Sequence, residues 1–346
     1  MAQVVKTKLT KLLGLRVPIV SAAMAYASLS KLAVEVSQAG GFGFFGVAGI
    51  TNAQLREQLY NARASIPDLG AKPLPIGCGF LGWIMDSKED EYKQLIDVAL
   101  ENGVQAIWLA FGTDLHRWVQ YIRNSKASAL PAHKPLIFVQ VTSVEEALQA
   151  ANDWKVDVIV VQGNESGGHG RSSAPSTMVL LSEVLAALPG ENAPPILAAG
   201  GIANGAQIAA YLTAGASGTV LGTRFLLTPE SPFSAVQKAA LQAAKSTNTV
   251  RTLAFDQARG TNHWPAGIDG RGIRNKIVDE IEAGVDEKTV QEKHRNAVQA
   301  GDPNYLVIWS GQGVSLMNEI KPAREIVQEL HADIVQTLQK AQQLLG

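Results

Sequence analysis

Residues 160–171, VVQGNESGGHGR, place one histidine among glycines directly after an apolar stretch. Glycine loses the most backbone freedom on folding, so such a cluster indicates a tight bend or a ligand close to the backbone. A flat ring could lie there, with His169 as its base, acid or hydrogen-bond donor. A loop histidine without chemistry is the alternative. A metal site is disfavoured, because the histidines at 116, 133, 263, 294 and 331 show no ligand spacing with it.

Two further glycine segments, AAGGI at 198–202 and LGT at 221–223, also follow apolar runs. The N–H groups of Gly201, Gly222 and Thr223 could donate to a phosphate, and the Thr223 hydroxyl could add to them. Tight turns in a compact fold are the alternative. A phosphate site would imply a phosphorylated substrate or a nucleotide-type cofactor.

Four other residues could contribute to a pocket. Cys78 is expected to be a small apolar filler, since a reactive cysteine needs an exposed, electropositive setting. Trp83, His263 and Trp264 could form a pocket wall, or the tryptophans could simply be packed.

The elements that must position these residues alternate between short apolar runs and longer amphipathic runs. Continuous apolar strands indicate a parallel sheet covered on both faces. We expect strands at residues 18–23, 41–46, 74–80, 106–111, 135–141, 156–163, 194–201 and 217–226, with helices after each and the eighth helix over 231–245. Thr51 or Asn52 is expected to cap the second helix.

Eight such units predict an α/β fold of the TIM (β/α)8 barrel type, whose active sites lie at the carboxyl ends of the strands. A doubly wound sheet would place its glycine-rich turn after the first strand, whereas here the glycines follow strands six to eight. We expect the barrel over 1–228, an insertion or lid over its mouth at 229–318, and a helix packing back at 319–346.

Composition excludes several classes of protein. The chain has 346 residues, 46% of them hydrophobic, and a formal net charge of −1, so neither nucleic acid nor a membrane surface is an expected partner. A single cysteine fits a reducing compartment, and we expect a cytoplasmic protein.

The basic N-terminus lacks the Arg and Ser richness of a transit peptide. Proline and glycine interrupt the uncharged stretch 192–223, which therefore predicts buried strands and a helix rather than a membrane span.

Together the segments PIVSAAMA, PIGCGFLGW, VQGNESGGHGR, AAGGIANG and VLGTRF resemble, in this order, the nitronate monooxygenases, also called 2-nitropropane dioxygenases. RGTNHWPAGIDGRGIRN and WSGQGV resemble the fungal-type branch of that family. The resemblance implies FMN as cofactor and His169 as the active-site histidine. It also implies the residues that contact FMN, which are Ala23, Met24, Gln162, Gly167, Gly200, Gly201, Val220, Leu221, Gly222 and Thr223.

The reaction that this resemblance implies is the oxidation of alkyl nitronates, such as propionate 3-nitronate, by O2 to a carbonyl compound and nitrite. One position departs from many relatives, because Gly79 stands where they carry Asn. The implied partners are therefore a small nitronate and O2, with a homodimer as an option.

Three rival functions can be compared with this one. An NAD(P)H:quinone reductase or a flavin-dependent enoyl-acyl-carrier-protein reductase would share the same loop, and the sequence does not separate them. An inosine-monophosphate-dehydrogenase-like enzyme is excluded, because the loop after strand six holds no nucleophilic cysteine. A non-enzymatic FMN or phosphate binder would have no use for His169.

Overall fold

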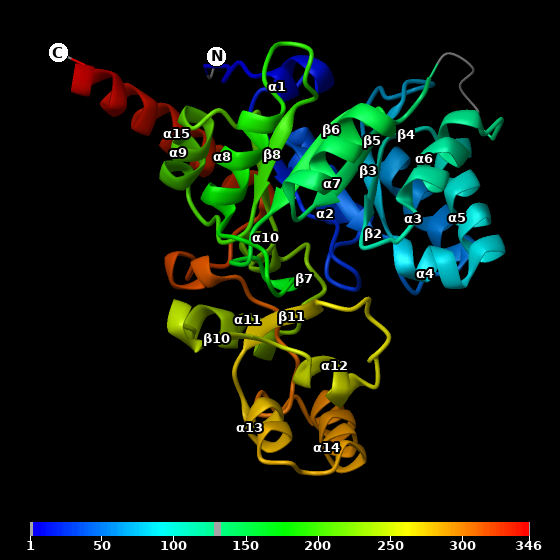
Figure 1. The fold of residues 1–346 in the computed structure, drawn as a ribbon, viewed down its shortest axis with the longest axis vertical. Coiled ribbons are helices and arrows are strands. Elements are labelled where there is room, and N and C mark those ends of the chain that lie inside the picture. Colours follow the sequence, from blue (N-terminus) through cyan, green and yellow to red (C-terminus); the bar gives the residue numbers. More distant parts are fainter. Residues whose placement is uncertain (1–2, 128–132, 346) are drawn as a thin grey trace.

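The computed structural model, which describes residues 3–127 and 133–345, contains a closed barrel of eight parallel strands (Figure 1). Neighbouring barrel strands pair in parallel all the way round, with one register shift between β3 and β4, and the last strand pairs with the first. The strands are β1 (Ile19–Ser21), β2 (Phe42–Gly46), β3 (Leu74–Leu81), β4 (Val104–Ala110), β5 (Leu136–Val141), β6 (Val158–Gln162), β8 (Ile196–Ala199) and β9 (Gly218–Leu221). The predicted TIM barrel is confirmed.

Aromatic side chains fill the interior of the barrel. Phe44 contacts Phe42, Trp108 and Phe138 edge-on, with ring centroids 5.0 to 5.1 Å apart. A Cβ atom on Gly77 would lie 2.1 Å from the Phe44 ring, so only glycine fits beside it. The helix α1 (Lys8–Leu13) contributes leucines to the same buried cluster. The barrel is therefore a packed core rather than a pore.

Helices surround the barrel. Thr51, one of the two predicted caps, begins α3 (Asn52–Ala64), and Ser143 begins α7 (Val144–Leu148); each side chain accepts a hydrogen bond from a first-turn N–H group. The helices that follow barrel strands are α2 (Ser30–Gln38), α3 (Asn52–Ala64), α4 (Gly82–Ser87), α5 (Glu89–Glu101), α6 (Leu115–Asn124), α7 (Val144–Leu148) with the π-helical turn η1 (Gln149–Asp153), α8 (Thr177–Ala187), α9 (Gly205–Thr213) and α10 (Thr223–Leu226).

The eighth place in the ring of helices belongs to the C-terminal helix, α15 (Ala323–Gln342). It packs against α9 and α2, the helices on either side of that place, and a short turn, η4 (Gln343–Leu345), follows it (Figure 1). The expected eighth helix, over 231–245, is instead α11 (Ala235–Ala243), which packs against the turn η3 (Gln312–Leu316). The helix itself is confirmed, but its expected place in the ring was wrong, since an amphipathic pattern does not say which surface a helix covers.

The chain between α10 and α15 forms a smaller body beside the carboxyl ends of the barrel strands (Figure 1). Phe255, Ile277, Val278 and Val290 form its own apolar cluster. Besides α11 and η3, its elements are η2 (Ser246–Asn248), β10 (Thr249–Thr252), α12 (Ala254–Arg259), β11 (Ile268–Ile273), α13 (Lys276–Glu282) and α14 (Glu287–Ala300).

A second sheet joins this body to the barrel. It is antiparallel, and its strand order is β10, β11 and then β7 (Gly168–Arg171). The last four residues of the glycine-rich segment are thus a strand, although the sequence predicts a loop there. Strand β7 is not part of the barrel, so the seventh and eighth barrel strands are β8 and β9.

The uncharged stretch 192–223 folds into β8, α9 and β9 with their connections. Within residues 3–127 and 133–345, no helix combines the length and the apolar character that crossing a membrane requires.

Candidate active site

His169 lies on β7, opposite Gly270 of β11, between two tryptophans. The Trp264 ring stacks on the imidazole, with centroids 3.6 Å apart and planes 12° apart. Trp309 approaches at 4.9 Å and 59°. A Cβ atom on Gly270 would lie 2.3 Å from the Trp309 ring, so glycine at this register position lets the indole reach the histidine.

A buried carboxylate contacts the same imidazole. His169 Nε2 lies 3.0 Å from both Asp256 oxygens, and Asp256 is fully buried on α12. The Thr261 hydroxyl donates to Asp256 Oδ1 at 2.9 Å, and Arg259 Nη1 lies 4.0 Å from the same oxygen. The smaller body therefore supplies a partner to a histidine 87 positions earlier in the chain.

Burial lowers the pKa of His169 below its ordinary value of 6.5. Asp256 acts in the opposite direction, whereas the positive charges of Arg259 and Arg251 lower the pKa further. The net effect is a neutral imidazole at pH 7, which can accept a proton.

Two arginines of the second sheet hold the backbone on both sides of His169. Arg251 donates to the carbonyl groups of Ser166 and Gly170 at 2.9 and 3.1 Å and pairs with Asp269 at 2.9 Å. Arg271 donates to the carbonyl group of Asn164 at 3.1 Å. These bonds satisfy backbone acceptors that would otherwise be unpaired in a buried loop.

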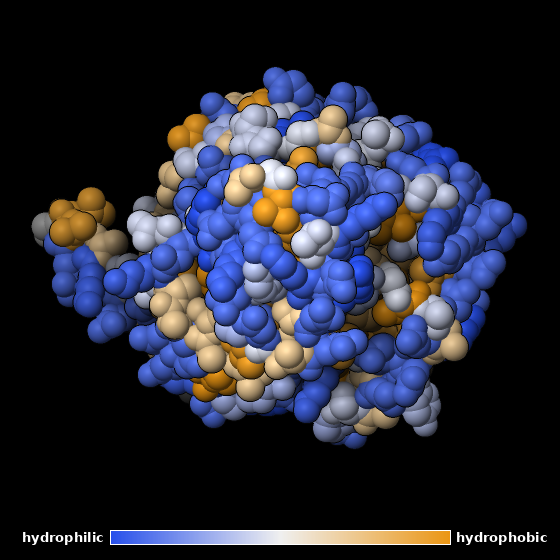
Figure 2. All heavy atoms as spheres, turned by 90° about the horizontal axis from the view of Figure 1, so that it is seen from below, coloured by the Kyte–Doolittle hydropathy of each residue, from blue (hydrophilic) through white to orange (hydrophobic). Residues whose placement is uncertain are grey.

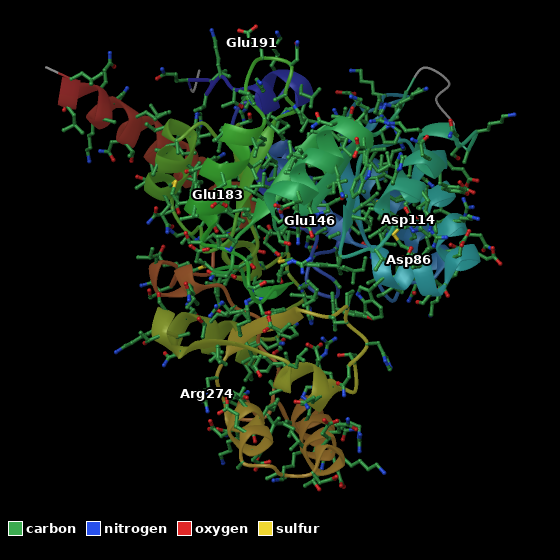
Figure 3. The ribbon with its side chains drawn as sticks, in the orientation of Figure 1. Asp86, Asp114, Glu146, Glu183, Glu191 and Arg274 are labelled. Carbon is green, nitrogen blue, oxygen red and sulfur yellow. The ribbon has the colours of Figure 1, made fainter. Side chains whose placement is uncertain are left out.

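The far end of β7 is tied to the barrel. Arg171 donates to Glu146 on α7 at 2.9 Å and to the Thr142 hydroxyl at 2.9 Å. Figure 3 shows Glu146 on the barrel side of the junction between the two bodies. The histidine strand is thus fixed from both sides.

The glycine segments after β8 and β9 have the properties that a phosphate site needs. Gly200 and Gly201 have φ angles of +123° and +69°, which L-residues rarely adopt. In the described part of the chain, the N–H groups of Gly201, Gly222 and Thr223 donate to no protein acceptor. Glu165, which lies close to Gly201, has its carboxylate engaged by the N–H and hydroxyl of Thr177 at 2.7 and 2.8 Å. The free donors fit an anion of phosphate type.

The WSGQGV segment packs onto the same loops. The Gly311 N–H donates to Thr223 Oγ1 at 3.0 Å, which leaves the threonine proton free to donate elsewhere. A Cβ atom on Gly167 would lie 2.4 Å from Gly311 N, and one on Gly313 would lie 2.3 Å from the Gly201 carbonyl oxygen. Glycine at these positions permits backbone to pack on backbone.

Other residues expected to contact a cofactor meet at the same barrel end. Ala23 lies against Gly79, where an added Cβ would be 2.2 Å away, and Met24 Sδ lies 3.5 Å from the Cβ position of Gly222. Gly79, which stands where many relatives carry Asn, thus has a steric reason, because an Asn side chain at this position would displace Ala23.

Three of the expected contacts come from strand ends. Gln162 accepts from Gln140 at 3.0 Å and donates to the His169 carbonyl at 3.3 Å. Val220 faces the barrel interior, whereas the Leu221 side chain faces the helices, so only the backbone of Leu221 is available to a ligand.

Of the remaining candidates, Trp83 and Trp264 lie together at the barrel end, whereas His263 and Cys78 do not. Trp83 and Trp264 meet with centroids 5.2 Å apart, and Phe111 contacts Trp264 at 5.5 Å, so these rings close over the ends of β3 and β4. His263 is exposed and belongs to no such cluster. Cys78 is fully buried in the layer between barrel and helices, and burial raises the pKa of its thiol, which fits a filler.

Sequence reasoning missed Asp256, Trp309 and Arg251. Their separations from His169 along the chain follow no helix or strand period, because only the pairing of β7, β11 and β10 brings them close to it. In the described residues, no group of three or more His, Cys, Asp or Glu side chains is arranged to hold a metal ion.

Comparison with known proteins points to one family. Residues 6–333 match the family described as nitronate monooxygenase. Nitronate monooxygenase npaC of Metarhizium robertsii is 33% identical over 329 residues, which cover 90% of this chain and 89% of that protein. FabK from Thermotoga maritima superposes with a TM-score of 0.78 at 27% identity, covering 98% of this chain and 99% of that one. Nitroalkane oxidase from Streptomyces ansochromogenes superposes with a TM-score of 0.77 at 26% identity, covering 96% and 99%.

Proposed function

Because this chain belongs to the nitronate monooxygenase family, we propose that it binds FMN at the mouth of the barrel and oxidises alkyl nitronates with O2. The products are a carbonyl compound and nitrite, and propionate 3-nitronate is a suitable substrate. The observation that carries the proposal is the position of His169, in contact with the buried Asp256 carboxylate, at the end of the barrel where the free phosphate-type donors also lie.

The residues that would hold FMN fit a single phosphate. The N–H groups of Gly201, Gly222 and Thr223 and the Thr223 hydroxyl would bind it, and the glycines leave its approach free of side chains. The backbone of Gly200, Val220 and Leu221 would border this site. Ala23, Met24, Gln162 and Gly167 would contact the flavin ring. FMN when bound supplies the redox chemistry between nitronate and O2.

The surroundings of His169 suit an anionic substrate. Arg251 and Arg259 place positive charge near the imidazole. His169 itself can orient the nitro group, or remove the α-proton when the substrate arrives as a neutral nitroalkane.

Anaerobic mixing of the purified, FMN-loaded protein with either a nitronate or NADPH tests the proposal. We expect the nitronate to bleach the flavin absorbance and NADPH to have little effect. Fast bleaching by NADPH alone would instead support an NAD(P)H-dependent reductase. Release of the flavin by heat, followed by chromatography, should yield FMN and not FAD.

We also propose a cytoplasmic location and a homodimeric state. Cell fractionation and sedimentation would test them.

A further inference from the structure

His169 presents two different ring nitrogens to its surroundings. Nε2 contacts Asp256 at 3.0 Å. Nδ1 makes no hydrogen bond within the described residues, and it is not among the buried polar atoms that lack a partner, so it retains access to open space. Only Nδ1 is therefore open to a substrate.

The partners of Asp256 determine how it can bond to the histidine. Its oxygens accept from the Thr261 hydroxyl at 2.9 Å and lie 4.0 Å from the Arg259 guanidinium, which supplies a counter-charge. An ionised carboxylate can only accept hydrogen bonds, so Nε2 must be the donor.

The imidazole ring is also prevented from flipping by 180°, a rotation that would exchange Nδ1 and Nε2. Trp264 stacks on it at 3.6 Å with nearly parallel planes, and Trp309 approaches at 4.9 Å. Exchanging the two nitrogens would require the ring to rotate through this stack and to leave the buried Asp256 carboxylate without its partner.

We infer that Asp256 is a positioning residue that holds His169 with its hydrogen on Nε2 and leaves Nδ1 as the acceptor of the α-proton of a neutral nitroalkane. This role rests on the proposed function. In the step, the α-carbon–hydrogen bond breaks, its electron pair delocalises onto the nitro group, and an Nδ1–H bond forms. The products are a nitronate anion, ready for oxidation, and an imidazolium whose charged neighbours are Asp256 and Arg259 of α12 and Arg251 of β10.

Nitrogen-15 spectroscopy of the protein labelled at its histidine rings tests the tautomer directly. The His169 signals are assigned by difference from the His169→Asn protein. At neutral pH we expect a protonated Nε2 and a bare Nδ1. In Asp256→Asn the side-chain amide can donate to Nε2, so the hydrogen should move towards Nδ1.

Kinetics of the FMN-loaded enzyme give a second readout. In Asp256→Asn, kcat/KM for a neutral nitroalkane should fall by roughly 10²–10⁴-fold, as expected for loss of a general base, while turnover of preformed nitronate changes little. Asp279→Asn, which alters an exposed acid of α13 paired with Arg274, is the matched control and should change neither.

Three results would overturn the role of Asp256. The first is a wild-type spectrum that places the His169 hydrogen on Nδ1. The second is an Asp256→Asn variant that loses kcat/KM equally on both substrates while its tautomer is unchanged, and the third is a wild type that oxidises nitronate but no neutral nitroalkane. If Asp256→Asn does not fold, the wild-type spectrum still decides. A wild type that oxidises no nitronate would refute the proposed function, whereas the spectrum would still report the tautomer.

Discussion

At the scale of single residues, His169 combines a hydrogen bond, an aromatic stack and a lowered pKa in one side chain. Each has a separate cause: α12 brings the carboxylate, the segment after it brings Trp264, and burial disfavours the charged imidazole. A nitronate is already an anion and needs no proton removed, so the two substrate forms can separate binding from proton transfer at this residue.

Replacing His169 by Asn should separate these roles. We expect the variant to keep FMN and most turnover of preformed nitronate, because Asn preserves a donor of similar reach. Turnover of neutral nitroalkane should fall by roughly 10²–10⁴-fold. The measurement is kcat/KM on both substrate forms. Equal losses would make His169 a binding residue, and no loss on either would leave it a histidine of β7 without chemistry.

The pH dependence on neutral nitroalkane follows from the lowered pKa. A base works only when unprotonated, so activity should be full at pH values above 6.5 and should be lost as the pH falls through a pKa below that value. The wild-type pH profile of kcat/KM measures it. An inflection above 6.5 would mean that Asp256 outweighs burial.

Thr223 tests the phosphate site. Thr223→Glu should abolish FMN retention while the barrel stays folded, because a carboxylate would take the free N–H groups and repel a phosphate. Flavin absorbance per chain and circular dichroism measure the two effects. Thr289→Glu, at an exposed position on α14, is the control. Unchanged flavin content in Thr223→Glu would place the phosphate elsewhere.

At the scale of elements, the second sheet explains why the glycine-rich segment is ordered. Strand β7 has only four residues and depends on β11 for its pairing. The arginines of β10 and β11 then bind the carbonyl groups of the turn that precedes it. The site is therefore built jointly by the barrel and the smaller body.

Arg251 should be necessary for this arrangement. Arg251→Gln leaves Asp269 and several carbonyl groups without a buried partner, and breaking a buried pair destabilises a protein by roughly 3–5 kcal/mol. Thermal unfolding and FMN content measure the effect.

Arg274→Gln is the control for this prediction. It removes an exposed arginine (labelled in Figure 3) that pairs with Asp279 and Glu282, and it should change the stability by less than about 1 kcal/mol. Similar losses in both variants would argue against a specific role for Arg251.

At the scale of the whole molecule, the C-terminus completes the barrel that the N-terminal part begins. Helix α15 covers the gap between α9 and α2, and its last turns project beyond the barrel (Figure 1). Figure 2 shows that the face seen from the side of the smaller body is mostly hydrophilic, with scattered apolar patches. The apolar side chains by which α15 packs on the barrel are Ile326, Val327, Leu330 and Ile334, which are all buried.

Leu330 tests this closure. It is buried in the barrel–helix layer, so Leu330→Ala should lower the free energy of unfolding by about 2–5 kcal/mol. Leu345, in the following turn, is 87% exposed, and Leu345→Ala should change it by less than about 0.5 kcal/mol. Denaturant unfolding of both variants provides the comparison. A small effect at Leu330 would mean that the barrel is stable without its eighth helix.

The sequence by itself determined the barrel and the end of it at which the glycine-rich loops converge. Strand–helix alternation is a local property, and the glycines after the sixth, seventh and eighth barrel strands mark loops that converge because parallel strands end at one edge. His169 could be singled out in the same way. The membership of the family also followed from short motifs in a fixed order.

Only the tertiary structure decided which residues surround that histidine. Asp256 lies 87 positions from His169 and Trp309 lies further still, and no periodicity links them. Their contact depends on the pairing of β7 with β11, where Gly270 opposes His169 and lets Trp309 approach. A helix packing back on the barrel at 319–346 could be predicted, but its place between α9 and α2 could not, because an amphipathic helix fixes the face that it buries and not the surface that it covers.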